Sequence, residues 1–423
     1  MNFDRMRVLL LERAIRGELV PQLTEDGSIE QVGDRKGLFD IPKSWGWFEF
    51  SNVVKTISSR GYQIPAKEIS EKGRYPVVTQ SKNSLIDGYS EEESKLVPKA
   101  FLPLLVFGDH TRFLKYVDFQ FIVGADGTKL MRPKDDNLVN CSYLYYVLRA
   151  LVPETKDRGY SRHFQFLKKL MIPVPPIHEQ CRIVDRVEEL LSEIDRAEKA
   201  YEELQTLASV LRGQILQKAI QGQLVTQLDT EPSVEMIGVA PRDVPFEIPD
   251  SWKWIRLDVM ATIVRGGSPR PIKSFITERE DGLNWIKIGD AERGTARISH
   301  CAEKIVPEGL KKTRFIKRGS LLLTNSMSFG YPYILDVDGC IHDGWLAFSD
   351  FESVLNRDYL YYTLLSPYCR SVFVSKAAGA VVKNLNIDKV KEVFIPVPPV
   401  KEQARIVAKV EELLKQVDAL SAG

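Results

Sequence analysis

The chain has little of what builds a cross-linked, metal-binding or membrane protein. Its 423 residues contain five cysteines, an odd number without close pairs in the sequence. This pattern argues against a disulfide framework or a zinc site and favours a reducing cytoplasm. No apolar run approaches the roughly 18–20 residues that a membrane span needs, and the charges scattered through the N-terminal segment are unlike a secretion signal. We therefore expect a cytoplasmic protein without a membrane partner.

The motifs of the common catalytic classes are also missing. The sequence contains no G-x-x-x-x-G-K-[ST] phosphate loop, no Asn/Asp-Pro-Pro-aromatic tetrapeptide, no G-x-S-x-G turn and no His/Cys set with metal-ligand spacing. These absences argue against ATP hydrolysis, adenine methylation, serine hydrolysis and zinc chemistry. We predict a chain that is not an enzyme, with no catalytic residue and no metal.

The chain as a whole has almost no excess of positive or negative charge, since its net charge is only +1. Lys and Arg exceed Asp and Glu by six in residues 41–172 and by three in residues 246–392, whereas residues 173–232 carry five excess acidic residues. Nucleic-acid affinity depends on the neutralisation of phosphates. A nucleic-acid-binding chain of this charge would bind modestly alone, and a partner would supply further positive charge.

What the sequence does contain is an internal repeat. Sixteen of 26 positions are identical between residues 170–195 and 393–418, and nine of 18 between residues 6–23 and 211–228. A shorter pair, FDIPKSWGW and FEIPDSWKW, precedes each of two inserts. The offsets of 223, 205 and 207 residues mean that the second insert is longer by 16 residues. The chain is therefore two copies of one plan.

The inserts, residues 55–165 and 262–385, show no convincing similarity to each other. A duplicated plan around two different inserts favours one mechanical role with two different targets. Gene duplication followed by drift is the alternative, although drift would also have eroded the repeated blocks.

The segment after the first insert has the periodicity of a long helix. Apolar residues recur in alternating steps of four and three, and no proline or glycine interrupts them before Gly213. The apolar series is Val187, Leu190, Ile194, Ala197, Tyr201, Leu204, Ala208, Leu211 and Ile215. We predict a helix over about 178–221, roughly 65 Å long at 1.5 Å per residue.

This helix needs a partner to bury its apolar seam. Its first half is copied at the C-terminus and its second half at the N-terminus. The simplest arrangement lays the two terminal segments antiparallel along the helix, in a pseudo-twofold, circular arrangement of the chain. Homodimerisation through the central helix is the alternative. The matching apolar residues are Met6, Leu10, Ala14, Ile15, Ile406, Val410, Leu413, Val417 and Leu420.

Each insert has the pattern of a mixed α+β domain. Short β-rich runs separated by Gly, Asp, Asn and Ser turns precede a helical stretch, at 141–152 in the first insert and 357–366 in the second. The tryptophans of the two IPxSW motifs are expected core anchors: Trp45, Trp47, Trp252 and Trp254. The predicted fold class is α+β, with two globular domains separated by a pair of long antiparallel coiled-coil helices.

The repeated IPVPPxxEQxRIV…VEELL blocks, the AIxGxLV blocks and the IPxSW motifs resemble the Type I restriction-modification specificity subunit family. In the second insert, RGGSPRP, WIKIGDAERG, GSLLLTNSMSFG and KNLNIDKVKEVFIPVPP are similar to that family's target recognition domains. The first insert is similar through YPVVTQSKNSLIDGY and GDHT. The resemblance implies a non-catalytic subunit in which each domain recognises one half of a split, asymmetric double-stranded DNA site.

The same resemblance implies partners and their cofactors. Family members bind two modification (methyltransferase) subunits, which carry S-adenosylmethionine, and are joined by restriction subunits, which carry ATP and Mg²⁺. The chain itself is expected to hold no cofactor. A stand-alone DNA-binding scaffold or repressor without a restriction role is the alternative.

The repeat and the resemblance together divide the chain into five segments. These are an N-terminal helix (1–23), a first target recognition domain (39–172), a central helical region (173–228), a second target recognition domain (246–394) and a C-terminal helix (395–423).

Candidate DNA contacts are polar residues in the loops that follow the β-rich runs, since Arg, Lys, Asn and Gln side chains recognise base edges in the major groove. Each of them could equally be a solvated loop residue. In the first insert they are Gln80, Ser81, Lys82, Asn83, His110, Thr111, Arg112, Tyr160, Arg162 and His163. In the second insert they are Arg265, Ser268, Arg270, Lys287, Asn325, Ser326, Ser328, Tyr331, His342 and Lys383.

Overall fold

The computed structural model describes residues 1–30, 37–82, 84–124, 127–152, 163–292, 294–326, 329–377 and 385–421. Contacts divide the chain into two compact units, Met1–Tyr201 and Glu202–Gly423. Helix α5 (Ile177–Ile220) begins in the first unit and ends in the second, close to the predicted bounds. Within the described ranges, no helix is long and apolar enough to cross a bilayer.

Two small sheets form the core of the first unit. One has the strand order β2-β9-β6-β7 and is antiparallel. The other has the order β3-β8-β4-β5, in which β8 is parallel to both neighbours. The bounds are β2 (Val54–Ile57), β3 (Gln63–Ile64), β4 (Tyr75–Val78), β5 (Gly88–Ser90), β6 (Leu104–Gly108), β7 (Leu114–Val117), β8 (Ile122–Gly124) and β9 (Thr128–Pro133). Val78 and Val123 of the second sheet join Val106 and Leu130 of the first in one buried cluster.

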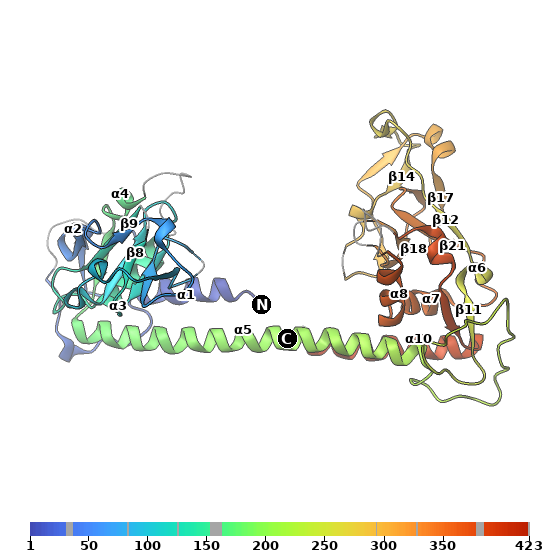
Figure 1. The fold of residues 1–423 in the computed structure, drawn as a ribbon, viewed down its shortest axis with the longest axis horizontal. Coiled ribbons are helices and arrows are strands. Elements are labelled where there is room, and N and C mark those ends of the chain that lie inside the picture. The colour runs from blue at the N-terminus through green and yellow to red at the C-terminus, as the bar shows by residue number, and fades with distance from the viewer. Residues whose placement is uncertain are drawn as a thin grey trace. The chain divides into compact units, whose positions relative to one another are not determined.

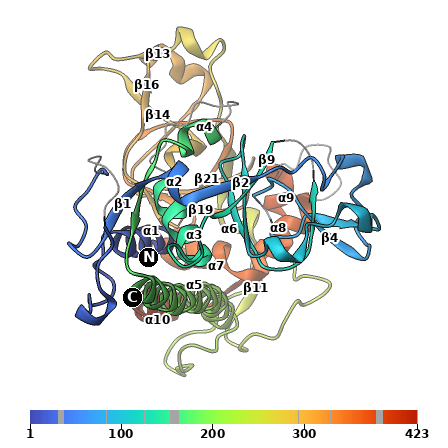
Figure 2. The same cartoon turned by 90° about the vertical axis from the view of Figure 1, so that its left-hand side faces the viewer.

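Two five-stranded sheets form the core of the second unit, with the orders β12-β21-β18-β19-β15 and β13-β16-β14-β20-β17. Figure 2 shows β13, β16 and β14 of the latter side by side. The bounds are β12 (Thr262–Arg265), β13 (Ile276–Thr277), β14 (Leu283–Ile286), β15 (Arg297–Ile298), β16 (Glu303–Ile305), β17 (Arg314–Ile316), β18 (Leu321–Thr324), β19 (Pro332–Leu335), β20 (Gly339–Ile341) and β21 (Trp345–Ser349).

The two units share one fold despite their different sequences. The order β12-β21-β18-β19 repeats β2-β9-β6-β7, and β20 is parallel to β14 as β8 is to β4. In both units a helix capped by asparagine follows the sheets, α3 (Cys141–Leu151) after Asn140 and α7 (Arg357–Leu365) after Asn356. The α+β class, the two helices and a common fold beneath the divergent inserts are therefore confirmed.

The IPxSW and IPVPP motifs close each unit as a two-stranded pair, β1 (Gly46–Glu49) with β10 (Met171–Val174) and β11 (Lys253–Arg256) with β22 (Phe394–Val397). All four tryptophans expected as core anchors are buried. The remaining short helices are α2 (Phe50–Val53), α4 (Phe164–Leu167), α6 (Leu257–Met260), α8 (Pro367–Ala377) and α9 (Ile387–Lys391).

Each terminal helix pairs antiparallel with α5 inside its own unit (Figure 1). In the first unit, α1 (Phe3–Ile15) places Phe3 beside Tyr201 and the Arg7 guanidinium 2.7 Å from Asp195. In the second unit, Arg212 of α5 lies 2.7 Å from Asp418 of α10 (Val400–Ser421). The predicted intrachain pairing of each terminal helix with α5 is therefore confirmed.

The prediction of a continuously buried seam on α5 is wrong in part. Val187, Ile194, Ala208 and Ile215 are buried, but Ala197 is exposed, Leu204 is 38% exposed and Leu211 is 40% exposed. Helix α10 instead contacts a stripe that includes Gln205 and Arg212, one position beyond Leu204 and Leu211. An ideal helix drifts from a strict seven-residue repeat, so the partner follows a displaced stripe.

Helix α1 also ends earlier than the predicted segment 1–23. Gly17 (φ +73°) and Gly222 (φ +71°) follow the last turns of α1 and α5 in the left-handed conformation that glycine favours at helix ends. A Cβ on either would approach within 2.4 Å of the ring of Pro42 or Pro249. The glycine in each AIxGxLV block therefore ends the helix and leaves room for the proline of the following IPxSW motif.

The repeated Glu-Gln dipeptide is buried in both units. Gln180 accepts a hydrogen bond from the Asn140 amide (2.8 Å) and donates to the carbonyls of Leu138 and Pro175 (both 2.8 Å). Gln403 repeats this pattern with the Asn356 amide (2.6 Å) and the carbonyls of Val354 and Pro398 (both 2.9 Å). The other members, Glu179 and Glu402, accept from Gln22 (2.9 Å) and Gln227 (2.6 Å). These buried contacts explain why the EQ motif occurs in both copies.

Candidate nucleic-acid interface

The sheet topology brings the predicted loops together at one edge of each unit. Strands β2 and β6 are both antiparallel to β9, so the loops that follow them leave the sheet where β9 begins. The same holds for β12 and β18 with β21. In the first unit the Asp109 amide donates to the Gly127 carbonyl (2.8 Å), and in the second the Asn325 amide donates to the Gly344 carbonyl (2.9 Å). Equivalent loops therefore meet in both units.

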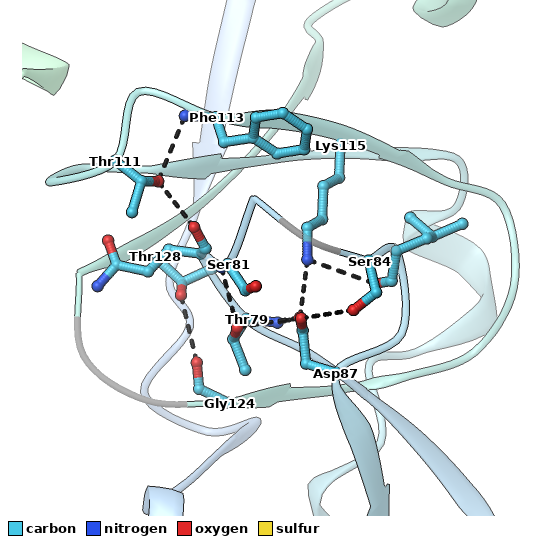
Figure 3. A network of polar contacts seen from close by, with 11 residues as sticks. Thr79, Ser81, Ser84, Asp87, Thr111, Phe113, Lys115, Gly124 and Thr128 are labelled. Atoms are coloured by element: carbon cyan, nitrogen blue, oxygen red, sulfur yellow. Dashed lines mark hydrogen bonds and ion pairs between the residues drawn. The ribbon is translucent and has the colours of Figure 1, made fainter. Parts of the chain in front are cut away.

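In the first unit, two of these loops are joined through Gln80. Thr111 Oγ1 donates to the Gln80 carbonyl (2.7 Å), and the His110 amide donates to Gln80 Oε1 (3.3 Å). A Cβ on Gly108 would lie 2.1 Å from Thr111 Oγ1, so only glycine permits this approach. Arg112 has a φ of +59°, and its amide donates to the Gly108 carbonyl (2.8 Å). Figure 3 shows the contact between Thr111 and the loop after β4.

Lys82 is the most exposed of the described first-unit candidates. Gln80, Ser81, His110, Thr111 and Arg112 are half-buried around it. Asn83, Tyr160 and Arg162 lie outside the described residues.

His163 lies beneath these loops. It is 2% exposed; its amide donates to the Asp109 carbonyl (2.9 Å), and its Nδ1 lies 3.0 Å from the same oxygen. The prediction of a surface contact at His163 is therefore wrong. The amide of Leu385 contacts Asn325 in the equivalent way (2.8 Å) in the second unit.

Asn325 is likewise buried, at 4% exposure, and its Nδ2 donates to the Asp343 carbonyl (3.1 Å). Its prediction as a direct DNA contact also needs correction. Asn325 is the first residue after β18, as Asp109 is the first after β6, and both side chains are buried where the loops cross. A residue that directly follows a strand can therefore be buried where two loops cross, and Asn325 is such a residue.

The second-unit candidates converge on Asp343. Ser268 Oγ donates to Asp343 Oδ1 (2.9 Å), and His342 Nε2 lies 2.9 Å from the same oxygen. Arg265 Nε donates to the Asp343 carbonyl (2.8 Å), and Arg270, whose side chain is 82% exposed, lies 3.9 Å from Oδ2. Asp343 was not predicted, because the segments that it joins are separated by about 75 residues in the sequence.

The two glycines of RGGSPRP explain the approach of these segments. A Cβ on Gly266 would lie 2.2 Å from the His342 carbonyl oxygen, and one on Gly267 would lie 2.6 Å from the Lys312 carbonyl oxygen. The backbone of this loop therefore packs directly on its neighbours, which leaves the side chains of Arg265 and Arg270 at the surface.

A cavity of about 760 Å³ opens beside Asp343. Its lining includes Arg270, Trp285, Lys287 and His342, with Lys287 Nζ 2.7 Å from Glu303 Oε1. Burial lowers the pKa of His342, the neighbouring cations lower it further, and Asp343 opposes them. The lowered pKa favours the neutral form of the imidazole.

Tyr331 and Ser326 belong to the loop after β18. Tyr331 is exposed, and the Arg370 guanidinium lies 3.9 Å from its ring centroid while donating to the carbonyls of Phe329 (2.8 Å) and Gly330 (2.6 Å). Ser326 is half-buried. Arg370 was not predicted, since it lies on α8, far along the chain. Ser328 and Lys383 lie outside the described residues.

Both units thus present polar loops at the edge of a sheet, with cations such as Lys82 in the first unit and Arg270 in the second, as expected of a nucleic-acid-recognition protein. Within the ranges that the structure describes, no three His, Cys, Asp or Glu side chains are placed to hold a metal ion. The family model described as the type I restriction modification DNA specificity domain matches residues 42–206 and 249–422. The chain belongs to this family, and its predicted role in DNA recognition rather than catalysis is confirmed.

Individual relatives are distant but similar over nearly their whole length. The chain is 23% identical over 385 residues to the type I restriction enzyme EcoR124I/EcoR124II specificity subunit of Escherichia coli, covering 89% of this chain and 87% of that protein. It is 20% identical over 399 residues to the EcoDI specificity subunit of the same species, covering 90% and 83%.

Solved structures share the fold. A chain from a structure on complex assembly and conformational transition of the type I R-M system superposes with a TM-score of 0.67 at 19% identity, covering 91% of this chain and 93% of that one. The HsdS subunit from Thermoanaerobacter tengcongensis gives a TM-score of 0.53 at 19% identity, covering 91% and 92%.

Proposed function

We propose that this chain is the DNA-specificity subunit of a type I restriction-modification complex, and that each unit recognises one half of a split, asymmetric double-stranded DNA site. The observation that carries the proposal is one sheet topology in two copies with different loop residues at the same edge. Gln80 and Thr111 join the loops in the first unit, whereas Asp343 joins them in the second. The same scaffold with different loops suits two different half-sites.

The proposed target recognition domains are residues 39–172 and 246–394. The proposed segments between and beside these domains are 1–23, 173–228 and 395–423, which contain the helices α1, α5 and α10. The pairings of β1 with β10 and of β11 with β22 support these boundaries, since each brings the beginning and the end of a recognition domain together.

Among the candidate contacts, exposure separates two proposed roles. Lys82, Arg112, Arg270 and Lys287 are cations at or near the surface and are proposed to contact phosphates or base edges. Gln80 and Ser268 hold the loops by hydrogen bonds and are proposed to position those cations. His163 and Asn325 support the loops from below.

Modification subunits are the proposed protein partners, one for each unit, with restriction subunits joining them. Exposed apolar side chains on the helices support docking: Met6 and Leu9 on α1 in the first unit, and Leu204, Leu207 and Leu211 on α5 in the second. Exposed apolar clusters commonly mark protein interfaces. S-adenosylmethionine, ATP and Mg²⁺ would be held by these partners.

The test maps methylated adenines in cells that express the modification partner with this chain or without it. The proposal predicts a split motif that is methylated only when the chain is present. Methylation that does not depend on the chain, or a motif without an unspecified spacer, would contradict it. A stand-alone repressor would give no methylated motif at all.

A further inference from the structure

A buried ion pair lies beneath the first-unit loop that follows β4. Lys115 on β7 is 3% exposed, and its Nζ lies 2.7 Å from Oδ2 of Asp87, whose side chain is 10% exposed. Removing two charges from water is costly, and a buried pair often stabilises a fold no better than apolar residues of similar size. The pair therefore needs an explanation other than core stability.

The carboxylate of Asp87 closes the loop on itself. Asp87 Oδ2 accepts hydrogen bonds from the amide (2.7 Å) and the hydroxyl (2.9 Å) of Thr79, and Oδ1 accepts from Ser84 Oγ (2.9 Å) (Figure 3). The Asp87 amide donates to the Val77 carbonyl (2.8 Å). The two ends of the loop over residues 79–87 are thus tied to one carboxylate, and Lys115 supplies the charge that balances it.

The order of this loop extends to the candidate DNA contacts. The Ser81 amide donates to Thr79 Oγ1 (3.0 Å), the same hydroxyl that contacts Asp87. The next residue, Lys82, is the exposed cation of this loop, and Gln80 joins it to Thr111 on the neighbouring loop. A substitution of Asp87 or Lys115 would therefore alter the conformation of the loop, although neither residue is itself a candidate DNA contact.

The second unit shows that the fold does not require a lysine at this position. Lys115 lies opposite Val106 of β6, and Tyr333 lies opposite Leu322 of the equivalent strand β18. Tyr333 is buried and packs edge-on against Trp345, with 5.8 Å between ring centroids. The sheet of the second unit holds an aromatic side chain where that of the first unit buries an ammonium group. The buried charge of Lys115 is therefore a feature of the first unit and not a requirement of the shared fold.

We propose that Lys115 and Asp87 form a positioning pair that sets the sequence preference of the first unit by holding loop 79–87 in its DNA-contacting conformation. This inference rests on the proposed function. Neither residue contacts DNA; both act through the loop that carries Ser81 and Lys82.

The pair persists at neutral pH. Burial alone would raise the pKa of Asp87, but the hydrogen bonds from Lys115, Thr79 and Ser84 outweigh burial, so the pKa lies below the ordinary carboxyl value of 3.8. Because this folded-state pKa is depressed, the contribution of the pair is present above the ordinary carboxyl pKa and is lost as the pH falls through the lowered pKa.

The test removes both charges and keeps the volumes. The double variant Lys115→Met/Asp87→Asn is prepared in the full chain with its modification partner. Amide hydrogen exchange over residues 79–87 should accelerate about tenfold or more, with α3 unchanged. Discrimination among bases of the first half-site should fall about tenfold, the loss of one specific contact, while the second half-site stays fixed. Lys115→Arg, which keeps the charge, should retain most of the discrimination.

A matched control is Arg186→Gln/Glu189→Gln, which removes an exposed ion pair of 2.6 Å on α5 and should alter neither readout. Accelerated exchange with unchanged first-half discrimination, or unchanged exchange, would overturn the proposal. If the double variant does not fold, Thr79→Val carries the same expectation, because it removes the hydroxyl that joins Asp87 to the Ser81 amide. A folded Thr79→Val variant with wild-type discrimination would then overturn it.

These outcomes distinguish a failure of the proposed function from a failure of the positioning pair. If the wild-type complex methylates no split motif, the proposed function fails, and hydrogen exchange still tests whether the pair holds the loop. If the split motif is present and only the variants behave as wild type, the positioning pair alone fails.

Discussion

Asp343 places five candidate side chains of the second unit within one polar cluster. Its carboxylate contacts Ser268, His342 and Arg270, and its carbonyl accepts from Arg265 and Asn325. The side chain of Arg270 is 82% exposed. A guanidinium forms two parallel hydrogen bonds with guanine, which a lysine ammonium group cannot reproduce.

Arg270→Lys should therefore keep the charge but weaken discrimination at one base pair of the second half-site by about 1–3 kcal/mol. Competition binding with duplexes substituted at each position measures this loss, and the first half-site should not change. The control is Arg279→Lys, at an exposed arginine paired with Asp281 of the same unit. An equal loss of affinity for every duplex, with discrimination unchanged, would instead assign Arg270 to a phosphate.

His342 gives DNA binding by the second unit a pH dependence. Burial, together with Arg265, Arg270 and Lys287, outweighs Asp343 and lowers its pKa below the ordinary histidine value of 6.5. DNA phosphates favour the protonated ring and raise this pKa, so binding takes up a proton. Affinity should then rise as the pH falls from about 8 to about 6, measured as Kd against pH. His342→Gln should remove this increment, and an identical pH slope in the variant would refute it.

At the scale of secondary-structure elements, the repeated EQ motif joins the start of α5 to the N-terminus of α3, and the start of α10 to the N-terminus of α7. Gln403 satisfies two backbone groups beside the N-terminus of α7, those of Val354 and Asn356, and the Pro398 carbonyl just before α10. Gln403→Ala leaves these groups unpaired in a buried site and should lower the free energy of unfolding by about 2–4 kcal/mol. Urea unfolding measures it. Gln416→Ala, at an exposed glutamine on the same helix, should change the free energy by about 0.5 kcal/mol or less.

Elements with strong periodicity were predictable from the sequence, whereas contacts between loops were not. The prediction of 178–221 for the central helix agrees with Ile177–Ile220, because the periodic pattern is long and no proline interrupts it. The buried stripe on α5 was misplaced, because the drift of the helix relative to seven residues depends on its partner. Asp343, Arg370 and the Lys115–Asp87 pair escaped prediction, because sheet topology, not sequence spacing, brings their partners together.

At the scale of the whole molecule, the duplication predicts two equivalent protein-docking surfaces. Leu207→Glu/Leu211→Glu changes two exposed apolar residues of α5 in the second unit. The variant should lower the number of modification subunits bound from two to one, because a buried unpaired charge opposes association. Native mass spectrometry counts the subunits. Glu203→Gln, a polar change on the same helix, is the control, and retention of two subunits by the leucine variant would refute this surface.

If one scaffold carries two independent recognition domains, one domain can be exchanged without altering the other. Residues 246–394 are replaced by the corresponding insert of the EcoR124I/EcoR124II relative, and methylated adenines are mapped in cells that supply the modification partner. One half of the split motif should change while the other half is retained. A change in both halves, or in neither, would contradict it.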